Sequence, residues 1–201
     1  AHWTDRNVLA ALQVNERPDA QGRRVLFVEA LQSDWATDRR ERKKAPDAPF
    51  VGTGSANEWL PLAVKRVAKL AVDEEFDRVA FTTGAQNAKR FELRGAKAAG
   101  MRTFYDEMLP NIVSKTLSRL GGGATVNVDV QAGDKVLSQP GFDVTPEMRR
   151  LAGDPMPMFA RADDNRGVGA PPEASRAPRP SAQRYQLRDF GRGAEFIQAV
   201  Q

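Results

Sequence analysis

The chain has 201 residues, a length that fits one domain or one domain with an appendage. It contains no cysteine and one histidine, His2, which excludes disulfides, thiolate metal sites and cysteine nucleophiles and argues against a serine–histidine–acid triad or a multi-histidine metal site. Thirty Lys and Arg against 26 Asp and Glu give a net charge of +4, less than a dedicated nucleic-acid-binding protein usually carries. No apolar run approaches the roughly 20 residues of a membrane-spanning helix, so we expect a soluble protein.

The first part of the chain predicts a β-hairpin followed by a loop. From Asn7 to Val14 apolar residues recur at every second position, which is the period of a half-buried strand. Turn-forming residues 19–22 separate it from a second strand, VLFVEAL at 25–31, and we expect the two strands to pair in antiparallel fashion. Residues 34–57 are polar and contain Pro and Gly, which predicts a long loop.

The middle of the chain predicts a helix and then a buried strand. Apolar residues recur at helical spacing at Leu60, Val64, Val67 and Ala71. The run DRVAFTT, residues 77–83, follows as a short apolar strand. Because a strand, a crossover helix and a second strand normally place the two strands side by side, we expect residues 25–31 and 77–83 to be parallel neighbours.

A second helical stripe extends from Met101 to Leu120, and Pro110 inside it should kink or divide the helix. Residues 126–130 alternate as a further strand. Thr145 followed by Pro146 has the pattern of a helix N-cap and first turn, and predicts a short helix through Leu151.

This order of elements predicts an α/β (α+β) fold with a mixed, partly antiparallel sheet flanked by helices. We expect residues 1–160 to form the core domain. Residues 161–184 are rich in Pro and Gly without apolar periodicity, which is typical of a linker or an extended strap. Residues 185–201 would then be a short C-terminal segment that docks as a terminal element.

Several strings occur in order between residues 2 and 159. They are His2-Trp3 with NVLA (7–10), VLFVEALQSDW (25–35), PDAPF (46–50), LAVKR (62–66), FTTG (81–84), FYDEMLP (104–110), DVTPEMR (143–149) and PMF (157–159). Together they resemble an uncharacterised domain of the large polyvalent proteins of bacteriophages and prophages. The resemblance implies a DNA-associated module whose partners are the other domains of a larger phage protein. It also implies a place in the host bacterial cytoplasm, with association to the virion beforehand.

Members of that family carry a longer segment between the FTTG and FYD strings than residues 86–101 supply here. The segment is here either genuinely shortened or a junction across missing residues.

The order strand, loop, helix, strand and helix also resembles the core of the acetyl-CoA-dependent N-acetyltransferases (GNAT-like). This resemblance implies acetyl-CoA as cofactor and no metal. In that fold a loop and the following helix N-terminus hold the cofactor pyrophosphate, and here Gly52, Gly54 and Ser55 precede the predicted helix. Thr82, Thr83 and Asn87 are further candidate cofactor contacts, although a turn-forming role explains Asn87 equally well.

Acetyl transfer to an amine needs a base that removes a proton and an acid that protonates the leaving thiolate. Glu29 on the second strand is the candidate base, directly or through water, and Tyr105 is the candidate acid. The alternatives are that Glu29 simply faces solvent and that Tyr105 packs in the core. An acyltransferase-like domain is the function that these residues favour.

The competing function is a non-catalytic module that binds nucleic acid or a protein partner. It depends on a basic run between two aromatic residues, Trp35 and Phe50, which could neutralise phosphates while a ring stacks on a base. The run consists of Arg39, Arg40, Arg42, Lys43 and Lys44. The alternative is a solvated loop that the two aromatic residues anchor to the core.

Overall fold

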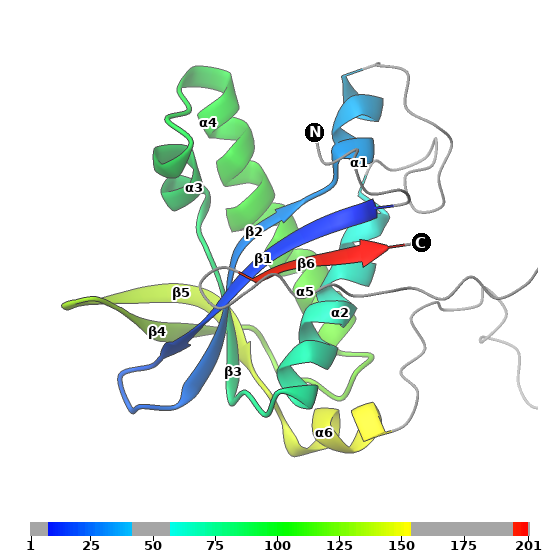
Figure 1. Ribbon diagram of the computed structural model, residues 1–201, viewed down its shortest axis with the longest axis vertical. Helices are drawn as coiled ribbons and strands as arrows, with labels where there is room; N and C mark the ends of the chain where they lie inside the picture. The colour runs from blue at the N-terminus through cyan, green and yellow to red at the C-terminus, as the bar shows by residue number, and fades with distance from the viewer. Residues whose placement is uncertain (1–7, 42–56, 154–194, 201) are drawn as a thin grey trace, which may run out of the picture.

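A computed structural model describes residues 8–41, 57–153 and 195–200. It shows a mixed α+β fold in which helices flank a mixed sheet of six strands, with β6 (Glu195–Val200) paired antiparallel to β1 at one edge (Figure 1). The strand order is β4-β5-β3-β2-β1-β6. The predicted fold class is therefore confirmed. The expected linker, residues 161–184, lies outside the described residues, as does His2.

The predicted hairpin is present. Strand β1 (Val8–Pro18) pairs antiparallel with β2 (Arg24–Gln32). The turn between them is organised by Asp19, whose carboxylate accepts hydrogen bonds from the backbone N–H groups of Gln21 (2.8 Å) and Arg23 (2.9 Å). Because Asp and Asn side chains can bond the backbone two residues on, this local chemistry fixes where the chain reverses.

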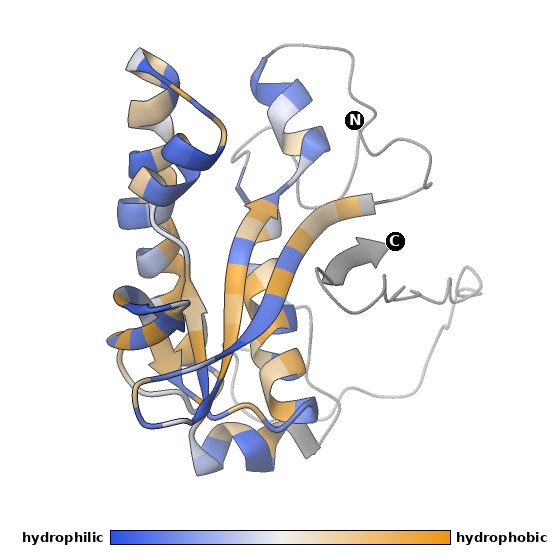
Figure 2. Ribbon diagram, turned by 60° about the vertical axis from the view of Figure 1, so that its left-hand side comes forward, coloured by the Kyte–Doolittle hydropathy of each residue, from blue (hydrophilic) through white to orange (hydrophobic). Residues whose placement is uncertain are grey.

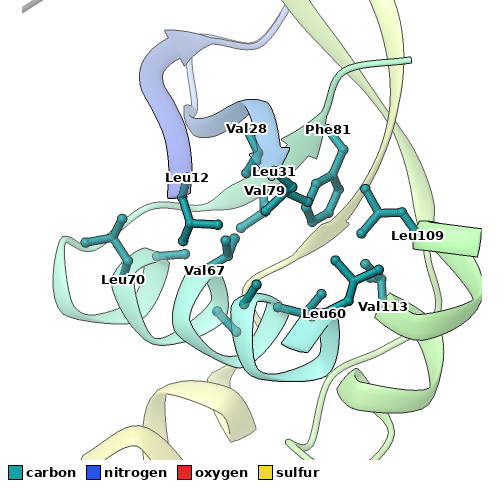
Figure 3. Close-up of a cluster of buried hydrophobic side chains, with 14 of the residues drawn as sticks. Leu12, Val28, Leu31, Leu60, Val67, Leu70, Val79, Phe81, Leu109 and Val113 are labelled. Carbon is teal, nitrogen blue, oxygen red and sulfur yellow. The ribbon is translucent and has the colours of Figure 1, made fainter. Parts of the chain in front are cut away.

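The predicted parallel pair is also present. From β2 the chain passes through α1 (Asp34–Arg40) and α2 (Trp59–Asp73) into β3 (Arg78–Phe81), which is parallel to β2. The apolar stripe of α2 packs on one face of the sheet, and Leu60, Val64 and Val67 are all fully buried. Figure 3 shows this packing: Leu60 and Val67 from α2 meet Leu12, Val28 and Val79 from the sheet.

The prediction of a loop from residue 34 onwards is wrong for its first part, because residues 34–40 form α1. The Ser33 side chain caps this helix by accepting a hydrogen bond from the Ala36 N–H, and its hydroxyl donates to the Leu9 carbonyl (2.7 Å). A cap of this kind supports a short polar helix that has little apolar periodicity.

Three helical segments and a π-helix connect β3 to β4. They are α3 (Gly84–Arg90), α4 (Gly95–Arg102), the π-helical η1 (Thr103–Met108) and α5 (Leu109–Leu117). The helix changes from the π-helical η1 to α5 just before Pro110, and the backbone at Met108 and Leu109 stays helical. Pro110 therefore accompanies a change of helix type and does not end the helix.

The last part of the sheet is a hairpin of β4 (Val126–Ala132) and β5 (Lys135–Asp143). Strand β5 lies between β4 and β3 and is antiparallel to both. The sequence analysis did not predict β5. The predicted short helix follows as α6 (Pro146–Gly153), and the Thr145 hydroxyl caps it by accepting from the Met148 N–H.

The two faces of the sheet differ. The face covered by α2 and α5 carries the large core, whereas the opposite face carries a small apolar cluster that includes Val25, Phe27 and Val128. Figure 2 shows β2 as hydrophobic over most of its length, with polar residues of β1 beside it. No helix among the described residues is long and apolar enough to cross a membrane.

Candidate functional site

The parallel strands β2 and β3 separate at their carboxyl ends. Their register runs from Val25 opposite Arg78 to Val28 opposite Phe81, and the last link is the hydrogen bond from the Thr82 N–H to the Val28 carbonyl (3.0 Å). Strand β2 continues to Gln32, while the chain after β3 turns into α3 (Figure 1). In α/β sheets, ligands bind outside the carboxyl ends of parallel strands where their connections diverge.

A β-bulge at Glu29 accompanies this separation. On β1, Gln13 and Val14 are adjacent, but their partners on β2 are Ala30 and Val28, so Glu29 is the extra residue. In a regular strand, backbone groups that point to the same neighbour recur every second residue. Here the Val28 carbonyl bonds Thr82 and the Leu31 N–H bonds Tyr105, both on the side of β2 away from β1. These two residues are three apart instead of two, which is the spacing that one inserted residue produces.

Tyr105 fills the gap that opens between the two strands. Its hydroxyl accepts a hydrogen bond from the Leu31 N–H (3.0 Å) and lies 3.3 Å from the Leu31 carbonyl, to which it donates. The residue is 3% exposed, and its ring contacts Phe104 edge-on at 4.9 Å between centroids. Burial raises the pKa of the Tyr105 phenol. The phenol thus takes the place on β2 that a further residue of β3 would otherwise occupy.

The start of α3 borders the same gap. Thr83 and Gln86 form a reciprocal capping box in which each side chain bonds the backbone N–H of the other residue. The buried Thr82 hydroxyl donates to Gln86 Oε1 (3.1 Å), and the Gly84 N–H donates to Asp106 Oδ1 (2.7 Å). The side chains of Thr82 and Thr83 therefore serve the cap of α3. The bond from Gly84 to Asp106 connects the start of α3 to η1.

Asn87 is the buried polar side chain nearest to Tyr105. It is 1% exposed, and its amide lies close enough to the Tyr105 hydroxyl to oppose the effect of burial on the phenol pKa. Its Nδ2 atom nevertheless makes no hydrogen bond of ordinary geometry. A buried donor without a partner costs about 1–3 kcal/mol, so its retention calls for an explanation.

Glu29 does not face solvent alone. One carboxylate oxygen accepts from Asn15 Nδ2 and from Arg17 Nη2 (3.0 Å), and the other accepts from Arg90 Nη1 (3.1 Å). Arg90 also donates to Gln13 Oε1 (3.0 Å). The Glu29 side chain keeps 16% of its surface exposed. It is therefore accessible, but donors from β1 and α3 hold both of its oxygens.

Arg90 links the two candidate catalytic residues. It bonds Glu29 directly, and its charge acts on the Tyr105 phenol. Asn87 precedes Arg90 by three residues on α3, so one short helix presents both side chains. The structure thus brings Tyr105 and Asn87 together and connects them to Glu29 through Arg90.

A small apolar pocket adjoins the other side of Tyr105. Its volume is about 10 Å³, and its lining includes Phe81, Leu109, Val113 and Pro140. A space of this size holds about one water molecule, so the pocket admits no large group in this conformation.

The remaining predicted site residues are not brought to this place by the described structure. Gly52, Gly54 and Ser55 lie outside the described residues, as do Arg42, Lys43 and Lys44. Arg39 and Arg40 end α1. Trp35, one of the two aromatic residues that flank the basic run, is 8% exposed and belongs to the main core, and Phe50 lies outside the described residues.

The sequence analysis missed the partners of Glu29. Gln13, Asn15 and Arg17 alternate along β1, and this two-residue spacing signals a polar stripe on one face of a strand. Arg90 carried no such signal, because its contact with Glu29 spans 61 residues.

Comparison of this chain with protein-family models, curated proteins and solved structures gave no match. Within the described ranges, no group of three or more His, Asp or Glu side chains is arranged to hold a metal ion.

Proposed function

We propose that this chain is an acyltransferase-like domain that takes acetyl-CoA as donor at the carboxyl ends of β2 and β3. The observation that carries the proposal is the separation of the two parallel strands after Val28 and Phe81, with the Tyr105 phenol placed between them. Ligands of α/β sheets bind where parallel strands diverge in this way, and the bulge at Glu29 directs a carboxylate to the same end of the sheet.

The residues at this gap suit an acyl donor. Acyl-CoA carries amide and thioester carbonyl oxygens, which are hydrogen-bond acceptors. The buried Asn87 Nδ2, which makes no hydrogen bond of ordinary geometry, is a donor that such an oxygen would satisfy. Thr82 and Thr83 would border the ligand through their backbone, since their side chains serve the cap of α3.

Two side chains would handle protons. Glu29 would take the proton from the acceptor amine, after Asn15 or one of the two arginines withdraws from its carboxylate. Tyr105 would give its phenolic proton to the leaving thiolate, after it releases the Leu31 carbonyl. Burial, which raises the phenol pKa, keeps this proton in place at neutral pH. Bound acetyl-CoA supplies the acyl group.

The strings between residues 2 and 159 that resemble a domain of the polyvalent proteins of phages and prophages support a place for this domain as one module of a larger phage protein. Such a module would work beside other domains of the same chain.

The proposal is tested by thermal unfolding and calorimetry with acetyl-CoA, with ATP as a control that carries phosphates but no acyl-pantetheine. Acetyl-CoA at 100 times its dissociation constant should stabilise the folded state by about 2.7 kcal/mol. Asn87→Ala should weaken binding, whereas Asn127→Ala, at an exposed position of β4, should not. No shift of the wild type at millimolar acetyl-CoA, or an equal shift with ATP, would reject the proposal.

A further inference from the structure

Helices α3 and α4 stand beyond the end of the sheet (Figure 1). Helix α4 has no buried residue, and four cationic residues of this region are exposed: Lys89, Arg94, Lys97 and Arg102. With the exposed Phe91 they form what we term the α3–α4 surface. It is distinct from the gap between β2 and β3, and the inference below does not rest on the proposed acyltransferase function.

The α3–α4 surface lies in a basic segment of the chain. Residues 84–102 contain five Lys and Arg and one acid, Glu92, which gives a net charge of +4. The net charge of the whole chain is also +4, so the other residues balance each other. The α3–α4 surface is therefore a basic part of the chain, and the run at 39–44 carries the same net charge.

The four cations are available to a partner. Among the described residues none of them forms a salt bridge, whereas Arg90 is held by Glu29. The acids nearest in sequence are Glu92 and, in η1, Asp106 and Glu107. Asp106 is engaged by the Gly84 N–H. The positive charge of the surface is therefore largely uncompensated by contacts within the described part of the chain.

An exposed aromatic ring belongs to the same segment of the chain. Phe91 is 49% exposed, and the Arg90 guanidinium lies 5.6 Å from its ring centroid. An exposed ring flanked by cations is the arrangement on which unpaired bases stack while neighbouring charges contact phosphates. A duplex would offer the phosphates but not the face of a base.

We propose that the α3–α4 surface binds single-stranded nucleic acid. Lys89, Arg94 and Lys97 contact phosphates, and one base stacks on Phe91. The absence of buried residues in α4 fits this partner, because phosphate contacts need exposed charges rather than an apolar groove.

The test is fluorescence anisotropy with a labelled single-stranded 12-mer, at several salt concentrations, on the folded full chain. The variant Lys89→Ala/Arg94→Ala/Lys97→Ala should lose at least tenfold in affinity. Its salt slope should fall by about 2, because three phosphate contacts on a single strand are lost. The matched control is Lys115→Ala/Arg119→Ala/Lys135→Ala, which removes the same charge from exposed positions on α5, the segment after it and β5. The control should bind like the wild type.

A second variant tests the stacking. Phe91→Ala should lose about tenfold in affinity with little change in salt slope, and Phe91→Trp should restore binding. Circular dichroism would verify that each variant is folded. The proposal is overturned if the control triple variant loses as much affinity as the first, if Phe91→Ala binds like the wild type, or if a duplex of equal length binds more tightly. Equal loss in Arg39→Ala/Arg40→Ala/Arg42→Ala with no loss in the first variant would place binding at the basic run instead.

Discussion

Tyr105 and Leu31, 74 residues apart in the chain, are joined by two hydrogen bonds through one phenolic oxygen. Strand β3 ends before it reaches Leu31, so this side chain satisfies backbone groups of β2 that no strand meets. The end of β2 therefore has two supports: β1 pairs with one edge, and Tyr105 of η1 bonds the other edge at Leu31.

Replacement of Tyr105 by Phe should destabilise the fold. The Leu31 N–H would remain buried without a partner, which costs about 1–3 kcal/mol. Urea unfolding followed by circular dichroism would measure the loss. Phe104→Leu, which changes an adjacent partly buried ring without removing a hydrogen bond, is the comparison. A Tyr105→Phe variant as stable as the wild type would show that the phenol does not hold β2.

Stability should also fall at alkaline pH because of Tyr105. Burial raises the pKa of the folded-state phenol, so its contribution is complete below the unfolded value near 10 and is lost as pH rises through the folded pKa. Unfolding midpoints between pH 8 and 11.5 would show a decline that Tyr105→Phe reduces. The chain has two tyrosines, Tyr105 and Tyr185, so absorbance titration of the Tyr105→Phe variant reports Tyr185 alone. Identical pH profiles for the two proteins would contradict this origin.

Gly84 and Gly100 should respond in opposite ways to replacement by Ala. A Cβ atom at Gly84 would lie 2.4 Å from Arg102 Cα and 2.6 Å from the Met101 carbonyl, which are backbone atoms that cannot turn aside. We expect Gly84→Ala to cost about 1–3 kcal/mol. A Cβ atom at Gly100, in α4, meets nothing within 4 Å, and Gly100→Ala should stabilise the helix by about 0.5–1 kcal/mol. Thermal unfolding of both variants would measure the contrast, and equal effects would refute the close approach of α3 to the end of α4.

Acid should weaken the turn between β1 and β2 through Asp19. Burial alone would raise the Asp19 pKa, but hydrogen bonds from the Arg23 and Gln21 backbone and from the Arg23 guanidinium together lower it. The ionised carboxylate therefore stabilises the fold above the unfolded pKa near 3.9, and this contribution is lost as pH falls through the folded pKa.

Asp19→Asn should accordingly cost about 1–3 kcal/mol at pH 7 and much less near pH 2, as measured by urea unfolding at both pH values. Asp134→Asn, in the exposed β4–β5 turn, is the control and should change stability little at either pH. If Asp19→Asn lowers the free energy of unfolding equally at both pH values, the charge of the Asp19 carboxylate does not stabilise the turn.

The elements that the sequence predicted correctly are those with a strong apolar period. Strands β1, β2 and β3 and helix α2 bury the same apolar positions that defined them, and their pairing followed from the order of elements. Strand β5 was missed because Pro140 and Gly141 normally interrupt strands. Gly141 is in fact required there, since a Cβ atom would lie 2.1 Å from the Val79 carbonyl. The close approach of β5 to β3 is a tertiary contact, and no local sequence pattern indicates it.

The candidate site was predictable in its residue types but not in its connections. Glu29 and Tyr105 were singled out because acids and phenols can transfer protons, and a Thr-x-x-Gln string at 83–86 could have predicted the start of α3. The bulge that places Glu29, and the bond between Tyr105 and the Leu31 backbone, depend on elements that are distant in the chain. Local patterns do not encode such contacts.

The place of β3 in the sheet has a consequence for synthesis on the ribosome. This strand has four residues, and its two neighbours are β2, made earlier, and β5, which ends at Asp143. Until translation has passed Asp143, one edge of β3 has no partner, and its apolar residues Val79 and Ala80 border an unpaired backbone. Nascent chains that stall between residues 82 and 134 would therefore present an open strand edge, the surface on which chaperones act and from which aggregation begins.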